Sequence, residues 1–500
     1  MFFNWDILSQ SCIFVNSRIS IFKSKIGNNK GVFERKGIFC VRINKKLWKN
    51  LVKCGKINRI NVFPSGSDSL KYTFDFKEIG ESIDFCTVKA EGFKTACASL
   101  SFMIPLTENA SLFALIPNIL TRSSEKYPTL THLEKKLATL YGAEIGVDVS
   151  KIGENQVLKL SVCSIDDRFA LHNEKIVEEC CRVLFELVFR PKFVDGVFLE
   201  DEVESEKRLL AEQLGAEISD KRVYAKNRLE EIMCADEAYG INRLGTIDGI
   251  NAITNEELTI AYKKLLKEAK VLLSVSANGS VETEGIKKLF LEYAENTERT
   301  PEKNETLYVE SAEDVTYVKE TAPVKQGKLV MGFRLGMKDR NDDYAAKRIM
   351  SDVFGGNPNS KLFKVVREEM SLCYYCSSRM LRAKGIMLVQ SGIESFNEEK
   401  AKTAILDQLE EIKKGNFTEE DLDASKKALE DAFKSVSDSP EALDSWFTTQ
   451  IEHSEYLYPE DYINMFKGVT KEDVIRAAND VTLDTVFMLE GTEDEEGENE

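Results

Sequence analysis

Histidines and cysteines are the first residues to consider, because imidazole and thiolate groups carry much of the metal-binding and nucleophilic chemistry of proteins. The sequence has three histidines, His132, His172 and His453. Two histidines bind zinc from one helix face when they are four residues apart, and no pair here has that spacing. We therefore predict that the three are surface or capping residues, and that the protein holds no metal or other cofactor.

Eleven cysteines are scattered along the chain without a regular framework. An odd number in this arrangement is typical of reduced thiols in a cytosolic protein. Cys373 and Cys376 form a C-x-x-C motif, but no second pair accompanies them. Residues three apart on a strand face opposite sides of a sheet, so we predict a structural role for both rather than a metal or redox site.

Other signatures of chemistry are missing from the sequence. It contains no Gly-x-Ser-x-Gly, no P-loop and no Gly-x-Gly-x-x-Gly after a strand. The net charge is −17, which would repel a phosphate backbone. No apolar run approaches the ~18 residues of a membrane span, and no signal peptide is recognisable. We predict a cytoplasmic protein that binds neither nucleic acid nor membrane.

Charge divides the chain unevenly. Residues 1–75 hold 14 basic and 4 acidic residues, so the remaining 425 carry a net charge of −27. We expect 1–75 to be a poorly ordered basic extension. The alternative is a basic arm that docks on an acidic partner. Residues 491–500 are predicted to be an acidic tail.

Between these ends, hydrophobic periodicity predicts strands and helices. A buried strand is expected over 93–106, and a hairpin joins the alternating segments 145–149 and 158–162. One helix is indicated by a stripe of apolar residues, namely Ile176, Val177, Cys180, Val183, Leu184 and Leu187. A long charged helix is expected over about 199–232.

The same order of elements then recurs. The helix start at 198–203 parallels that at 417–422, and the start at 253–258 parallels that at 469–474. Thr254 and Thr470 open the second pair, each with an acid three residues later. Strands expected at 271–277, 329–335, 386–393 and 485–489 complete the pattern. We infer two copies of an α+β unit of about 200 residues, and chance similarity of helix starts is the alternative.

Two motifs follow one another in the second copy, FGGNPNSKLF at residues 354–363 and VREEMSLCY at residues 366–374. They resemble the Gly-Gly-x-x-x-Ser-x-Leu-Phe turn and the Arg-Glu-x-x-x-Leu-x-Tyr string of the M16 family of zinc metallopeptidases. Together with the duplicated unit, the resemblance covers about residues 85–490. The resemblance implies that Arg367 and Tyr374 contact substrate, a role that suits hydrogen-bond donors facing a peptide carbonyl.

The fold implied by this resemblance is two homologous M16-type α/β-sandwich domains in tandem. The N-terminal-type domain would span 80–295 and the C-terminal-type domain 323–490, with a linker at 296–322.

The family's zinc motif, His-x-x-Glu-His, is degenerate in this chain. Counting back from the anchor at 124–128, its ligand and base positions hold Ala114, Pro117 and Asn118. The distal glutamate ligand is replaced by Gln213. Without imidazole the remaining carboxylates would hold zinc poorly. We therefore expect no catalytic residues and no peptidase activity from this chain alone.

Some M16 relatives work as paired chains, in which one subunit holds zinc and the other binds substrate. The resemblance thus implies a non-catalytic subunit that binds a peptide or an unfolded protein and pairs with a subunit carrying an intact His-x-x-Glu-His. A purely structural scaffold is the alternative, and an autonomous enzyme with a displaced metal site is a third possibility. The pattern is most similar to an inactive group of Gram-positive bacteria associated with elongation factor P 5-aminopentanol modification.

Overall fold

The computed structural model describes residues 13–15, 32–35, 38–41, 72–295, 297–303, 305–453 and 456–491. The predicted acidic tail, apart from Gly491, and most of the predicted basic extension lie outside these residues. The chain divides into two compact units, 1–70 and 71–500. Within the first unit, short antiparallel strands pair in the order β1-β3-β2, with bounds Ile13–Val15, Ile38–Val41 and Val32–Arg35.

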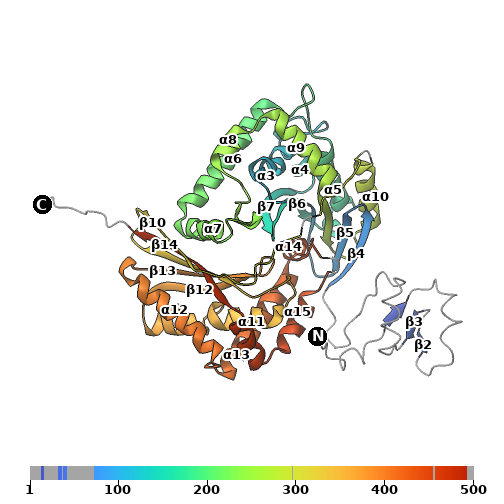
Figure 1. Cartoon of the computed structure of the whole chain (residues 1–500). Coiled ribbons are helices and arrows are strands. Elements are labelled where there is room, and N and C mark those ends of the chain that lie inside the picture. The colour runs from blue at the N-terminus through green and yellow to red at the C-terminus, as the bar shows by residue number, and fades with distance from the viewer. Residues whose placement is uncertain are drawn as a thin grey trace. The chain divides into compact units, whose positions relative to one another are not determined.

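The second unit begins with a mixed sheet in the order β4-β5-β9-β6-β8-β7, and residues 72–295 that form it are called the first half (Figure 1). Only β5 and β9 are parallel neighbours. The predicted hairpin is confirmed, because Ile145 pairs with Val162 and Val149 with Leu158. The strands are β4 Tyr72–Gly80, β5 Ile83–Ala90, β6 Thr95–Pro105, β7 Glu144–Ile152, β8 Asn155–Ile165 and β9 Lys270–Ala277.

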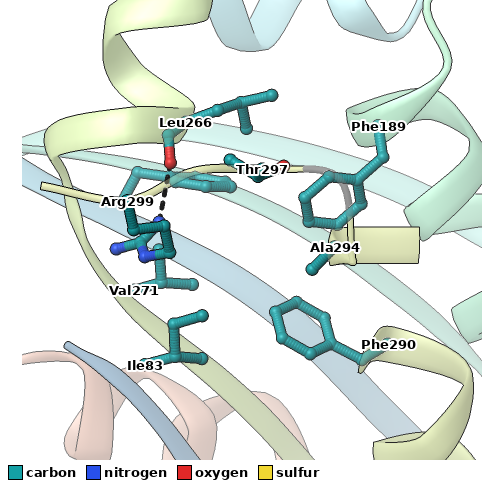
Figure 2. Close-up of a pocket in the computed structure, with 9 residues that line it drawn as sticks. Ile83, Phe189, Leu266, Val271, Phe290, Ala294, Thr297 and Arg299 are labelled. Carbon is teal, nitrogen blue, oxygen red and sulfur yellow. Dashed lines mark hydrogen bonds between the residues drawn. The ribbon is translucent and has the colours of Figure 1, made fainter. Parts of the chain in front are cut away.

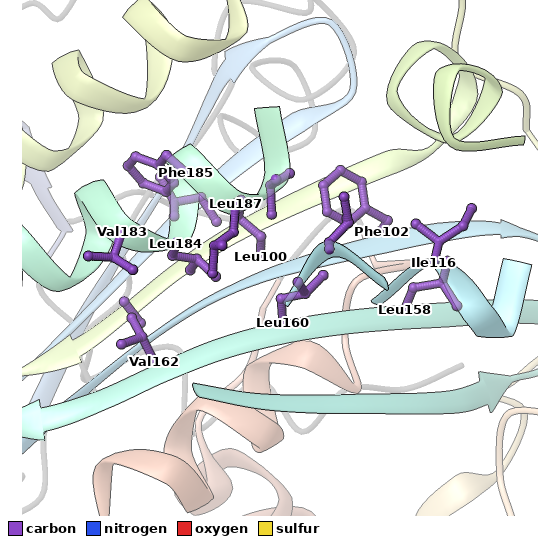
Figure 3. Packing of buried hydrophobic residues seen from close by; sticks show 14 of the residues in the cluster. Leu100, Phe102, Ile116, Leu158, Leu160, Val162, Val183, Leu184, Phe185 and Leu187 are labelled. Atoms are coloured by element: carbon purple, nitrogen blue, oxygen red, sulfur yellow. The ribbon is translucent and has the colours of Figure 1, made fainter. Parts of the chain in front are cut away.

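Helices cover one face of this sheet. The predicted apolar stripe lies on α5, and all of its residues are buried. Figure 3 shows Val183, Leu184 and Leu187 packed toward Leu100 and Val162 of the sheet. The helical segments of this half are α3 Ala110–Leu120, α4 Leu130–Thr139, η1 Asp167–Phe169, α5 Ile176–Phe189, α6 Glu200–Ser219, α7 Lys221–Met233, η2 Ala238–Gly240, α8 Ile247–Ala252, α9 Asn255–Glu268 and α10 Thr283–Ala294.

The second half, residues 316–491, forms a sheet in the order β10-β14-β11-β13-β12. These strands correspond in order and direction to β5-β9-β6-β8-β7, since β10 and β14 are the parallel pair. The strands are β10 Thr316–Ala322, β11 Gly327–Arg334, β12 Cys373–Leu381, β13 Ile386–Ile393 and β14 Thr482–Gly491. The shared order of five strands confirms the predicted duplication and the α+β fold of two sandwiches.

Helices of the second half cover the outer face of its sheet (Figure 1). Thr254 before α9 and Thr470 before α16 each form the predicted capping box with the acid three residues on. The helical segments are α11 Tyr344–Gly355, η3 Leu362–Glu369, η4 Ser395–Asn397, α12 Glu398–Lys413, α13 Glu419–Lys434, η5 Ser435–Asp438, α14 Pro440–Thr448, α15 Pro459–Lys467 and α16 Lys471–Asn479. Among the described residues, no helix combines the length and apolar character that a membrane crossing needs.

Two boundaries differ from the prediction. The strand β4 begins at Tyr72, inside the segment 1–75, because alternate aromatic residues of this strand face the core; Phe74 packs against Phe447 with 4.7 Å between ring centroids. The segment 296–322 ends in a strand, β10, which pairs with β14 along its whole length.

The predicted single helix over 199–232 is wrong. It is two helices, α6 and α7, which meet at Asp220. The Asp220 carboxylate accepts hydrogen bonds from the amides of Arg222 and Val223, and this cap competes with a continuous helix.

The break at Asp220 lets α7 leave its own half. Leu229 and Met233 of α7 pack on Val330 and Phe487, which belong to the inner face of the second sheet. Gly332 makes this approach possible, because a Cβ there would lie 2.5 Å from the Met233 sulfur. A helix of the first half thus completes the core of the second.

The second half in turn supplies a helix that packs on the first sheet. Leu443 and Phe447 of α14 pack on Val88 and Leu272, on the inner face of the first sheet. The Asp444 carboxylate accepts a hydrogen bond from Ser99 at 2.7 Å. Each half therefore needs one helix of the other to bury its sheet.

Buried charges join the two halves beside these helices. Glu237 of the first half forms ion pairs with Lys384 and with Arg334, the latter at 2.7 Å. Lys384, whose side chain is 0% exposed, also binds Glu154 at 2.6 Å, and Arg334 binds Asp484 at 2.7 Å. Both cations are thus neutralised by carboxylates, and Glu237 is shared between them.

We predict that Glu237→Gln lowers the free energy of unfolding by about 3 kcal/mol, because Lys384 and Arg334, both buried, each lose one of their two ion pairs. Urea denaturation of the full chain measures this. Asp431→Asn is the control, since Asp431 and Lys427 form an ion pair whose side chains are about 60% exposed. That change should alter stability by no more than ~0.5 kcal/mol, and equal effects would contradict the prediction.

A pH dependence follows from the same residue. Burial alone would raise the pKa of Glu237, but hydrogen bonds from Arg334 and Lys384 lower it below 4.5. The unfolded chain then takes up the proton first, so the stabilisation is complete above about pH 4.5 and is lost as the pH falls through the folded pKa. The difference in stability between wild type and Glu237→Gln should therefore shrink as the pH falls below about 4.5; a constant difference would contradict the assignment.

Candidate functional site

The degenerate zinc-motif positions lie on α3, inside the core of the first half. Ala114 is 0% exposed, Pro117 is buried and Asn118 is half-buried. Pro117 has no N–H to donate to the carbonyl of Phe113, yet the helix continues to Leu120. This face of α3 is filled by apolar packing, and its side chains include no metal ligand of the kind that zinc prefers.

The fourth position does not complete a site either. Gln213 is exposed and lies on α6, whereas the other three motif positions lie on α3. On the same helix Glu206 is buried, and its carboxylate binds Arg122 at 3.1 Å. Burial raises the pKa of Glu206, and Arg122 opposes that shift. Among the described residues, no group of three or more His, Cys, Asp or Glu side chains is arranged to hold a metal ion.

The three histidines occupy different surroundings. His132 is exposed and its ring nitrogen lies 2.7 Å from the hydroxyl of Thr129, at the start of α4. His172 is exposed, as predicted. His453 differs from the prediction, because it is half-buried after α14 and burial, with Arg340 nearby, lowers its pKa to about 3.

The Arg/Tyr motif forms a distinct feature of the second half. Arg367 lies in η3, a π-helical turn of the kind that is frequent at functional sites. Its guanidinium stacks over the Phe363 ring, 4.4 Å from the centroid, and lies 3.5 Å from Glu368. Tyr374 is 73% exposed at the start of β12, the last strand of its sheet. Both residues present hydrogen-bond donors near one edge of the second sheet.

A β-bulge separates η3 from the regular part of β12. Cys373 pairs with Ile393 and Tyr375 with the next residue, Gly392, so Tyr374 is the extra residue of the bulge. The inserted residue restores Cys376 to the side of the sheet that Cys373 occupies. The expectation that these two cysteines face opposite sides is therefore wrong.

The pKa values of the two thiols depend on each other. The neighbouring Cys376 thiol is the largest cause that lowers the pKa of Cys373 to about 7, and the charge of Arg367 acts in the same direction. Cys376 is 4% exposed and the pKa of its thiol is raised, first by the Cys373 thiol and then by burial. Cys373 is the accessible and more acidic member of the pair.

A small apolar hollow lies elsewhere, between α10 and the first sheet (Figure 2). Ile83, Val271 and Phe290 line it, and the guanidinium of Arg299 at its rim donates to the carbonyl of Leu266 at 2.7 Å. The space admits no more than about one water molecule. It is a packing defect of the core and not a ligand site.

Comparison with known proteins identifies the relatives of this chain. The family described as peptidase M16 inactive domain matches residues 252–429. The probable inactive metalloprotease YmfF of Bacillus subtilis (strain 168) is 31% identical over 425 residues, which are 85% of this chain and 99% of that protein.

Solved structures agree with this assignment. A conserved protein from Enterococcus faecalis V583 has a TM-score of 0.76 and 25% identity, with 84% of this chain and 99% of that one covered. A peptidase M16 inactive domain from Pseudomonas fluorescens, with a TM-score of 0.67 and 17% identity over 84% of this chain and 98% of that one, shares the fold. The chain therefore belongs to the peptidase M16 family, as an inactive member.

Proposed function

We propose that the chain is the non-catalytic, peptide-binding subunit of a heterodimeric M16-type zinc peptidase in the cytoplasm. A partner subunit with an intact His-x-x-Glu-His would hold the zinc, and Arg367 and Tyr374 would contact the substrate in trans. The observation that carries the proposal is the contrast between the two halves. The metal positions Ala114, Pro117 and Asn118 are apolar or unsuited to zinc, whereas Arg367 and Tyr374 reach the surface.

The chemistry of Arg367 and Tyr374 supports peptide binding. A guanidinium and a phenol can both donate to a peptide carbonyl or to the oxyanion that develops on it. Their position beside β12 adds a second mode of contact, because an edge strand has backbone groups that an extended peptide can pair with.

The charge of the chain favours one class of substrate. Residues 76–500 carry a net charge of −27. An acidic surface raises the local concentration of cationic ligands, so the preferred substrates would be basic or unfolded peptides.

The alternative is a scaffold that binds the same partner but no peptide. Both functions agree with an apolar α3, so only the role of the Arg/Tyr motif separates them. A scaffold would tolerate loss of Arg367 without any change in hydrolysis by the assembled pair.

We predict that Arg367→Ala reduces hydrolysis by the assembled pair about tenfold, because a charged hydrogen bond of this kind contributes about 1.5 kcal/mol or more. The measurement uses purified chain mixed with a His-x-x-Glu-His subunit of the family and a quenched fluorescent peptide rich in lysine and arginine. Tyr374→Phe should lower the rate as well. The control is Arg379→Ala, which removes an exposed arginine of β12, the strand that contains Tyr374. Unchanged hydrolysis in Arg367→Ala, with the pair still formed, would favour the scaffold.

A separate prediction concerns the metal. The chain purified alone should contain far less than stoichiometric zinc by elemental analysis and should not hydrolyse the peptide, because the motif supplies no imidazole ligand. Stoichiometric zinc, with activity that a chelator removes, would instead indicate an autonomous enzyme with a displaced site.

A further inference from the structure

The thiols of Cys373 and Cys376 lie together at the start of β12, beside the Arg/Tyr motif. Their partners on β13 are Ile393 and Ser391, two residues apart, so the two cysteines occupy one face of the sheet. Ser391 lies opposite Cys376, and its hydroxyl donates a hydrogen bond to the carbonyl of Tyr375 at 3.1 Å. The bulge at Tyr374 creates this proximity, which a regular strand would not allow.

The two cysteines differ in access. Cys376 is 4% exposed and packs in the core of the second half. Cys373 is half-buried at the strand start, where a small molecule can reach it. Thiol–disulfide exchange begins with the thiol that the small disulfide can reach, which in this pair is Cys373.

We propose that Cys373 and Cys376 form a redox-active dithiol, which a low-molecular-weight disulfide closes to an intramolecular disulfide. This site goes beyond the proposed function and does not depend on peptide binding or on a partner subunit.

The reaction proceeds by two exchanges. The Cys373 thiolate attacks one sulfur of the small disulfide, forms a mixed disulfide and releases one small thiolate. Cys376 then loses its proton and attacks the Cys373 sulfur, which forms the intramolecular bond and releases the second small thiolate. The dithiol is oxidised by two electrons, and the small disulfide is reduced to two thiols.

A second close pair of thiols provides an internal comparison. Cys97 and Cys163 lie opposite each other on β6 and β8, with 2.8 Å between their sulfur atoms. The hydrogen bond from Cys163, followed by burial, raises the pKa of Cys97, so this thiol stays protonated. Each pair thus has one half-buried and one buried thiol, whereas the lowered pKa belongs to Cys373.

Closure would change the neighbouring surface. A disulfide holds its sulfurs about 2.05 Å apart, closer than two separate thiols can approach. The start of β12 must therefore move toward Cys376, and Tyr374, the residue inserted between the two, moves with it.

The test is a titration of the full chain with glutathione disulfide at pH 7, followed by alkylation, trypsin and mass spectrometry. Both cysteines lie on the single tryptic fragment Glu368–Arg379, so the closed form carries no alkyl group and is two hydrogen atoms lighter than the unalkylated dithiol. A bond between Cys97 and Cys163 would instead link two fragments. We expect fragment 368–379 to lose the two hydrogens at lower glutathione disulfide than any linkage of the other pair, and dithiothreitol to restore them.

Two variants test the order of the exchanges. In Cys376→Ser, fragment 368–379 should retain one glutathione on Cys373, and in Cys373→Ser it should gain nothing. Alkylation of Cys373 at pH 7 should also be about tenfold faster than that of a cysteine of ordinary pKa in an unstructured peptide, since about half of it is thiolate.

Three results would overturn the proposal. The fragment could stay reduced while Cys97 and Cys163 become linked. The wild-type chain could accumulate the mixed disulfide at Cys373 without closing. Reduced wild-type Cys373 could also react no faster than the peptide cysteine, which would remove the basis for selective attack.

Discussion

Glu237 is the residue on which the association of the two halves depends most directly. Its carboxylate binds two buried cations of the second half. Arg334 is the last residue of β11, and Lys384 lies in the turn between β12 and β13. Buried charges of one sign are destabilising unless opposite charge lies beside them, so the first half must remain in place for the second to keep its cations buried. The helices α7 and α14 impose the same condition through apolar packing, because each covers the other half's sheet. The duplicated units are therefore one cooperative structure.

The local elements were largely predictable from the sequence, because their patterns are set by neighbours in the chain. The apolar stripe on α5 and the capping boxes of Thr254 and Thr470 are examples, since periodicity and capping need only residues within a few turns. The exchange of α7 and α14 was not predictable, because each helix packs on a sheet formed by residues far away in the sequence. The break at Asp220 could have been suspected from its capping chemistry, but a charged helical pattern continues on both sides of it.

The candidate site could also be predicted only in part. Loss of the zinc ligands was visible in the sequence, and the structure adds that Ala114 is fully buried in apolar core. The bulge at Tyr374 was not visible, because register is decided by pairing with β13 and not by β12 alone. One inserted residue reverses the direction of the side chains before it, which is why Cys373 and Cys376 meet. In this region the positions of chemical groups depend on a single irregularity of the backbone.

The exchange of helices also has a consequence for synthesis on the ribosome. The inner face of the first sheet, with Val88 and Leu272, is covered by α14, which begins only at Pro440. Translation proceeds from the N-terminus, so this apolar face emerges and pairs its strands long before its cover exists. The nascent chain must therefore carry an open hydrophobic surface until nearly the whole protein has been made. During that interval the uncovered face is open to association with other chains.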